Sequence, residues 1–116
     1  MEAEFVAAIK TVAPTENVYF DVAASGAPTP YVVVQQVGGE IIDFIGNDLP
    51  NLRNARLQVA VWGKSRVQVN ALSRAIESAM RTVTTLHAVK PIGALVADYD
   101  MDTLLYGARQ DFSVWN

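Results

Sequence analysis

Three aspartates at alternate positions are the most obvious candidates for chemistry in this sequence. Asp98, Asp100 and Asp102 have the Asp-x-Asp-x-Asp spacing with which a calcium-binding EF-hand loop begins. The sixth position of such a loop should be Gly and the twelfth Glu, but here they are Thr103 and Arg109. The flanking residues have the pattern of β-strands instead of helices. The sequence therefore indicates a solvated acidic turn, and we expect no metal site.

Nucleophilic catalysis finds equally little support. The chain contains a single histidine, His87, and no cysteine, which excludes thiolate catalysis, Cys-based metal sites and disulfide bonds. Neither Ser65 nor Ser73 lies in the nucleophile-elbow pattern that a triad with His87 would need. Gly38 and Gly39 match no phosphate-binding loop. We expect no enzyme, no catalytic residue and no cofactor.

Two tryptophans are candidates for stacking on single-stranded nucleic acid, since Trp62 and Trp115 each end a strand-like segment. Proteins that bind in this way surround the rings with positive charge, whereas this chain has a net charge of −3 and a pI of about 4.9. We therefore interpret both residues as strand-end side chains that cover the edge of the core. Sequence-specific binding of nucleic acid is not expected.

Length and composition predict one soluble domain over residues 1–116. The hydrophobic fraction of 51% is ample for a core and leaves apolar surface over for a partner. The first residues lack the basic region and the apolar run of a signal peptide, and no apolar stretch approaches the ~20 residues of a membrane span. We expect a protein made in the cytoplasm, with no membrane partner.

A strand followed directly by a helix forms the predicted centre of this domain. Over 54–63, every second residue is apolar, as in a strand with one buried face. Ser65 and Gln68 have the spacing of a helix capping box. After them comes an apolar stripe at helical spacing, formed by Leu72, Ala75, Ile76, Ala79, Met80 and Val83. We expect Leu72, Ile76 and Met80 to be buried against Leu57, Val59, Val61, Phe112 and Val114.

The other predicted elements are a helix over 2–12, a short extended piece over 18–20, and strands over 31–37, 40–45, 92–99 and 104–115. The helix is indicated by Phe5, Ile9 and Val12, and residues 24–30 form a loop. The order α-β-β-β-α-β-β, with short connections, predicts an α+β domain with a mostly antiparallel sheet of four to five strands and two helices packed on it. The hairpin over 31–45 is partly apolar on both faces. Two explanations are open. Either the alternation of polar and apolar residues is simply imperfect, or one face of the hairpin packs on a neighbouring subunit.

Several blocks of the sequence resemble a known protein family. Val18-Tyr-Phe-Asp-Val-Ala-Ala-Ser-Gly-Ala-Pro-Thr-Pro-Tyr-Val-Val-Val-Gln35, Arg56-Leu-Gln-Val-Ala-Val-Trp62, the helix after Ser65 and Asp111-Phe-Ser-Val-Trp115 occur in the order found in bacteriophage tail-completion or tail-terminator proteins, the group similar to minor tail protein U. The resemblance covers most of the chain. Val34 departs from it, because an aromatic residue is more usual at that position.

The resemblance implies a structural protein of a phage or prophage tail, located in the virion tail and without an active site. Such proteins form a ring, usually of six subunits, that caps the tail tube, ends its polymerisation and joins the head connector. The implied partners are other copies of the chain, the major tail tube protein and the head–tail connector protein. The alternatives are another head–tail joining or injection-machine adaptor protein, and a small ligand-binding protein or enzyme.

The loop over 46–54 contains the residues that we predict to contact the tube or a neighbouring subunit. Leu49 and Leu52 are apolar residues in an otherwise polar segment, and Arg53 follows them directly. The alternative is that both leucines pack on their own domain.

Overall fold

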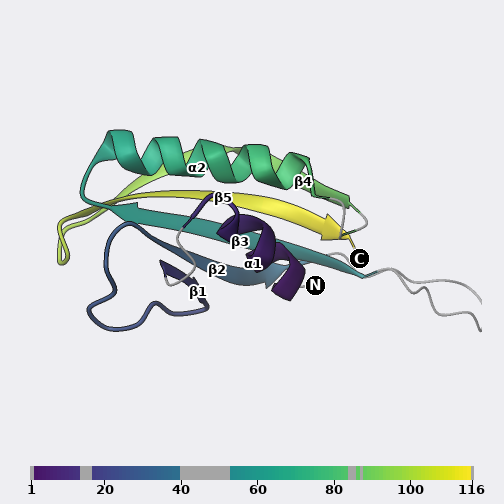
Figure 1. The fold of residues 1–116 in the computed structure, drawn as a ribbon, viewed down its shortest axis with the longest axis horizontal. Coiled ribbons are helices and arrows are strands. Elements are labelled where there is room, and N and C mark those ends of the chain that lie inside the picture. The colour runs from purple at the N-terminus through teal and green to yellow at the C-terminus, as the bar shows by residue number, and fades with distance from the viewer. Residues whose placement is uncertain (1, 14–16, 40–52, 84–85, 87, 116) are drawn as a thin grey trace, which may run out of the picture.

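Within the described residues, both helices lie on one face of a five-stranded sheet (Figure 1). The computed structural model describes residues 2–13, 17–39, 53–83, 86 and 88–115. Along the chain the elements are α1 (Glu2–Lys10), β1 (Val18–Phe20), β2 (Tyr31–Gly38), β3 (Asn54–Gly63), α2 (Arg66–Arg81), β4 (Ala88–Asp100) and β5 (Leu105–Trp115). In the sheet they follow the order β1-β2-β3-β5-β4.

The predicted α+β class and the order α-β-β-β-α-β-β are confirmed. The pairs β2–β3, β3–β5 and β4–β5 are antiparallel, and β1 pairs with β2 in parallel. The first of the three consecutive strands is β1, which the sequence indicated only as a short extended piece. The strand predicted over 40–45 lies outside the described residues.

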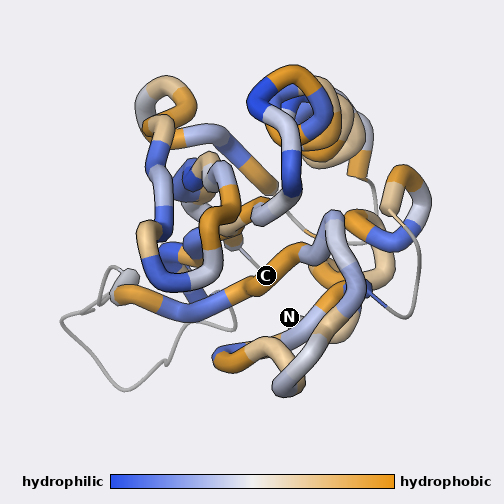
Figure 2. The backbone as a smooth tube through the Cα atoms, turned by 90° about the vertical axis from the view of Figure 1, so that its left-hand side faces the viewer, coloured by the Kyte–Doolittle hydropathy of each residue, from blue (hydrophilic) through white to orange (hydrophobic). Residues whose placement is uncertain are grey.

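The core lies between the helices and one face of the sheet. Because side chains alternate between the faces of a strand, Leu57, Val59 and Val61 of β3 are all buried on this face. Pairing places Phe112 opposite Leu57, and the rings of Phe112 and Phe5 of α1 meet edge to face with their centroids 5.8 Å apart. Figure 2 looks along the long axis of the molecule and shows hydrophobic and hydrophilic residues mixed within the sheet.

The core face of β2, which the sequence left open, is the face of Val32 and Val34. Both side chains are fully buried, and they pair with Val61 and Val59 of β3. Tyr31 and Val33 point to the other face of the sheet, which the helices do not cover, and both are half-buried there. We call this second side the helix-free face.

The prediction for the first helix is right about its inner side and wrong about its end. Phe5 and Ile9 are fully buried, but Val12 is 38% exposed. The helix ends at Lys10 and a turn follows. In this turn the amide of Val12 donates a hydrogen bond to the Ile9 carbonyl. Helical spacing therefore no longer applies to Val12, and Ala13 is buried in its place.

α2 begins as predicted, but its buried side is displaced from the predicted stripe. Ser65 caps the helix in an extended conformation, and its hydroxyl accepts from the amide of Gln68. The buried residues are Val69, Ser73, Ile76 and Met80, which have the spacing of a single helix face. Leu72 is only partly buried at the margin, so its predicted place in the buried line is wrong. The predicted stripe contains only apolar residues, so it did not include Ser73, although this serine is buried.

Trp62 and Trp115 also differ from expectation. Both are partly exposed on the helix-free face and do not cover the edge of the core. Trp62 pairs with Gly107 of β5, and a Cβ atom at Gly107 would lie only 2.6 Å from the Trp62 ring. The ring therefore covers the space that a side chain on β5 would otherwise fill.

A bulge interrupts β4 where it passes the middle of β5. The residues between Ile92 and Val96 have no regular partners on β5. Gln110, which is buried, occupies this place: its side-chain amide donates to the Gly93 carbonyl at 3.1 Å and to the carboxylate of Glu77 in α2 at 2.9 Å. One side chain therefore links the sheet, the bulge and the helix.

Candidate interaction surfaces

The predicted contact residues fall at the boundary of the described chain. Leu49 and Leu52 lie outside the described residues. Arg53 is exposed immediately before β3. The structure therefore places Arg53 at the solvent surface beside the start of β3, and the predicted roles of all three residues stay predictions.

Several residues that the sequence offered as candidates for chemistry either stabilise a turn or are buried in the core. Asp98 accepts a hydrogen bond from the amide of Tyr99, and Asp100 accepts one from the amide of Asp102, so both carboxylates stabilise the turn after β4. Ser73 is buried under α2. In the described part of the chain no three acidic or histidine side chains are grouped so that they could hold a metal ion. His87 lies outside that part.

The turn between β4 and β5 is an apolar projection with acidic residues around it. We call residues 98–106 the hairpin tip; Figure 1 shows it at the left-hand end of the sheet. Met101 is 80% exposed and Leu104 66% exposed. Nearby on α2, Val67 is 79% exposed. So much apolar surface at one end of a small domain is typical of a site of protein contact.

Arg66, in the first turn of α2, fixes the base of the hairpin tip. Its guanidinium donates to the carbonyls of Asp98 and Gly107, both at 2.6 Å, and lies 5.3 Å from the centre of the Tyr106 ring. The rings of Tyr99 and Tyr106 are in turn 5.0 Å apart. These contacts join the two strands and the helix, so the tip projects from a fixed base.

Besides the hairpin tip, the structure has a second candidate surface, a hollow beside the bulge of β4 on the helix-free face. Two adjoining hollows of ≈ 500 and ≈ 270 Å³ share Arg56 and Ile92 in their walls, and we call them together the basic groove. Arg109 is exposed in its wall, and Arg56 forms an ion pair with Asp111 at 2.7 Å. The remaining lining residues are Val37, Gly38, Gly39, Asn54, Gln58, Gly93, Ala94, Val96, Gln110 and Ser113.

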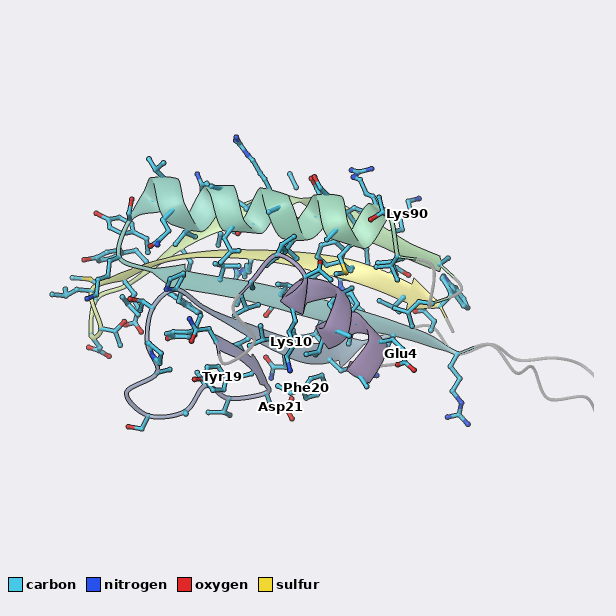
Figure 3. All side chains as sticks on the ribbon, viewed as in Figure 1. Glu4, Lys10, Tyr19, Phe20, Asp21 and Lys90 are labelled. Carbon is cyan, nitrogen blue, oxygen red and sulfur yellow. The ribbon has the colours of Figure 1, made fainter. Side chains whose placement is uncertain are left out.

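A third hollow, of ≈ 310 Å³, lies between α1 and the end of α2. Its walls are Ala7, Ala8, Ala79 and Val83, with Glu4, Thr11 and Thr82. In Figure 3, Glu4 and Lys10 lie on α1, with Tyr19, Phe20 and Asp21 next to the end of this helix, as the contacts between α1 and β1 also show. Lys90 belongs to β4, the opposite edge of the sheet.

Sequence reasoning found the acidic turn but missed both of the larger surfaces. A signal for the hairpin tip was present, because Met101 and Leu104 are apolar residues in a segment predicted to be a solvated turn. For the basic groove the sequence offers only one signal: Arg56 and Arg109 begin two similar segments, Arg56-Leu-Gln-Val-Ala-Val-Trp62 and Arg109-Gln-Asp-Phe-Ser-Val-Trp115. Only the pairing of β3 with β5 brings these arginines to one face.

The sequence matches a known protein family. The model of the family described as tail completion protein gp17 matches residues 5–116, which is nearly the whole chain. A comparison with curated proteins finds no match. Among the described residues, no helix is long and apolar enough to cross a membrane. The chain therefore belongs to the tail completion protein gp17 family, whose members are structural components of the bacteriophage tail.

Proposed function

We propose that this protein closes the phage tail tube as an oligomeric ring of six subunits. The ring ends polymerisation of the tube and offers its outer surface to the head connector. The partners are other copies of the chain, the major tail tube protein and the head–tail connector protein. The protein is made in the host cytoplasm and acts without catalysis.

The family match over residues 5–116 is the observation that carries this proposal. It extends over α2, all five strands that the structure describes and α1 from Phe5 onward, so nearly the whole domain, and not one motif, matches tail completion proteins. The exposed hairpin tip and the uncovered sheet face supply surface for more than one partner.

The loop before β3 is proposed to make part of the contact with the tube or with a neighbouring subunit. Its contact residues are Leu49, Leu52 and Arg53. The exposure of Arg53 next to the sheet is compatible with this role. Leu49→Asp together with Leu52→Asp should leave the domain folded and abolish its addition to tails.

Tail tubes that lack this protein provide the direct test. Purified tubes are mixed with the protein, tube subunits are then added, and tube lengths are measured by negative-stain electron microscopy. We expect tubes treated with the protein to keep their length and to show an added disc at one end. Purified heads should then join only the treated tubes.

Two results would oppose the proposal. Continued growth of tubes at the untreated rate, with the protein in excess, would rule out termination. Blocked growth without any joining of heads would leave termination in place but remove the connector role. Leu49→Asp with Leu52→Asp is the matched variant, provided that its melting temperature equals that of the wild type.

A further inference from the structure

We propose that the hairpin tip of one copy of this chain docks in the basic groove of the next copy. This inference rests on the proposed ring and names the surfaces that build it. The occupant of the groove is thus a second molecule of the same protein. The tip is the projecting surface and the groove is the receiving one.

The hairpin tip has the chemistry of an inserted segment. Met101, Asp102 and Leu104 are all exposed in the turn, so a carboxylate lies there among apolar side chains. Arg66 holds the base of the tip by two hydrogen bonds to backbone carbonyls. A segment that is already ordered loses little conformational entropy when it binds.

The basic groove has the opposite charge and similar apolar content. Arg109 is exposed in the groove and makes no ion pair with any other residue that the structure describes. Arg56 is 48% exposed despite its ion pair with Asp111. Ile92 and Val96, next to the bulge, are 38% and 48% exposed. A partner with carboxylates beside apolar side chains would satisfy both the charge and the apolar surface.

The exposed end of the hairpin tip is distant from the Ile92 end of the groove in its own chain. Nine residue steps separate Met101 from Ile92 along β4, which is at most roughly 30 Å at about 3.3 Å per residue. The groove begins at Val96 and Arg109, beside the base of the tip, and extends away from Met101 toward Ile92, so the projecting end and the receiving surface are at different places on one molecule. A contact between two different surfaces repeats from copy to copy, and it forms a closed ring when the rotation per copy closes.

Charge reversal tests this contact. Asp102→Arg changes the tip and Arg109→Glu changes the groove, and Arg74→Glu on the exposed side of α2 is the matched control. Each of the first two variants should weaken self-association by at least roughly tenfold, because like charges then meet. The control should associate as the wild type does.

Mixing the two variants gives the sharpest result. The reversed tip of Asp102→Arg fits the reversed groove of Arg109→Glu, and the two unchanged surfaces also fit each other. An equal mixture should therefore recover association in alternating rings, as should the chain with both changes. Sedimentation of the free proteins and the amount bound to tail ends provide the two readouts, and melting temperatures confirm that each variant is folded.

A cross-link makes the test independent of charge. Because the chain has no cysteine, Met101→Cys with Ile92→Cys introduces the only two thiols. Oxidation on capped tails should give a ladder of covalent multimers, since the Cα atoms must approach to within about 7 Å for a disulfide to form. Either cysteine alone should give dimers at most.

The outcomes separate this inference from the proposed function. Capping by the wild type, with equal capping by both reversed variants and no ladder, would overturn the tip–groove contact and leave the function intact. A wild type that forms ladders but does not stop tube growth would support the contact and oppose the function. Failure of the mixture to recover association, with both proteins folded, would also overturn the contact.

Discussion

Among single residues, Ser73 is unusual because its hydroxyl is buried in the interface between α2 and the sheet, which is mostly apolar. Ser73 is 7% exposed, and its oxygen has no hydrogen-bond partner within the described parts of the chain. A buried polar group without a partner lowers stability, since it has given up its bonds to water.

Replacing this serine should therefore stabilise the protein. We expect Ser73→Ala to raise the free energy of unfolding by about 1–2 kcal/mol, from the lost desolvation cost and the better helix propensity of alanine. Ser78→Ala, at an exposed position of α2, should give the propensity gain of at most about 0.5 kcal/mol. Urea denaturation of both variants measures the difference. A loss of stability at Ser73 alone would show that its hydroxyl is hydrogen-bonded.

Tyr31 predicts how stability depends on alkaline pH. Burial, with a smaller effect from the negative charge of Asp100, raises the pKa of Tyr31 above its ordinary value of 10.0. The folded protein therefore holds the phenol proton more tightly than the unfolded chain does. The resulting stability is complete below the ordinary pKa and is lost as pH rises from there through the raised pKa.

Tyr31→Phe removes this titration. Its stability should fall less steeply than that of the wild type above about pH 10, where an unperturbed tyrosine ionises. Asp100→Asn should reduce the slope by a smaller amount, because burial is the larger cause. Urea midpoints measured at increasing pH give the slopes. Parallel curves for the wild type and Tyr31→Phe would contradict the assignment.

At the scale of elements, α2 depends on its buried line of side chains. Ile76 is 1% exposed beneath the helix. Ile76→Ala should lower the free energy of unfolding by roughly 2–5 kcal/mol, through lost burial and the cavity left behind. Val67→Ala on the same helix, at a site 79% exposed, should change it by less than about 0.5 kcal/mol. Equal effects of the two substitutions in urea denaturation would mean that the helix packs through another face.

Much of the fold was predictable from local patterns. The alternation in β3 and the cap at Ser65 depend on neighbours in sequence, and both predictions are right. Val12 and Leu72 were assigned from helical spacing, which fails where the helix ends and where packing selects a different line of residues. The basic groove depends on strand register and on a bulge, so distant segments decide it and no local pattern indicates it.

At the scale of the whole molecule, the protein should need no metal ion. Of the three aspartates in the hairpin tip, Asp98 and Asp100 accept hydrogen bonds from backbone amides and Asp102 lies in the turn. Thr103 and Arg109 replace the Gly and Glu of a calcium-binding loop. Treatment with a chelator should leave both the melting temperature and the capping of tails unchanged. Stabilisation by added calcium that is lost in Asp100→Asn would contradict this expectation.

The bulge in β4 bears on the tendency of the sheet edge to aggregate. β4 is an outer strand of the sheet, and long unbroken outer strands invite uncontrolled stacking of chains into fibres. Here the bulge divides the strand into two short paired stretches, and Pro91 in the first has no amide hydrogen to donate. The irregularity that makes room for the basic groove therefore also interrupts the edge along which copies of the chain could stack into fibres.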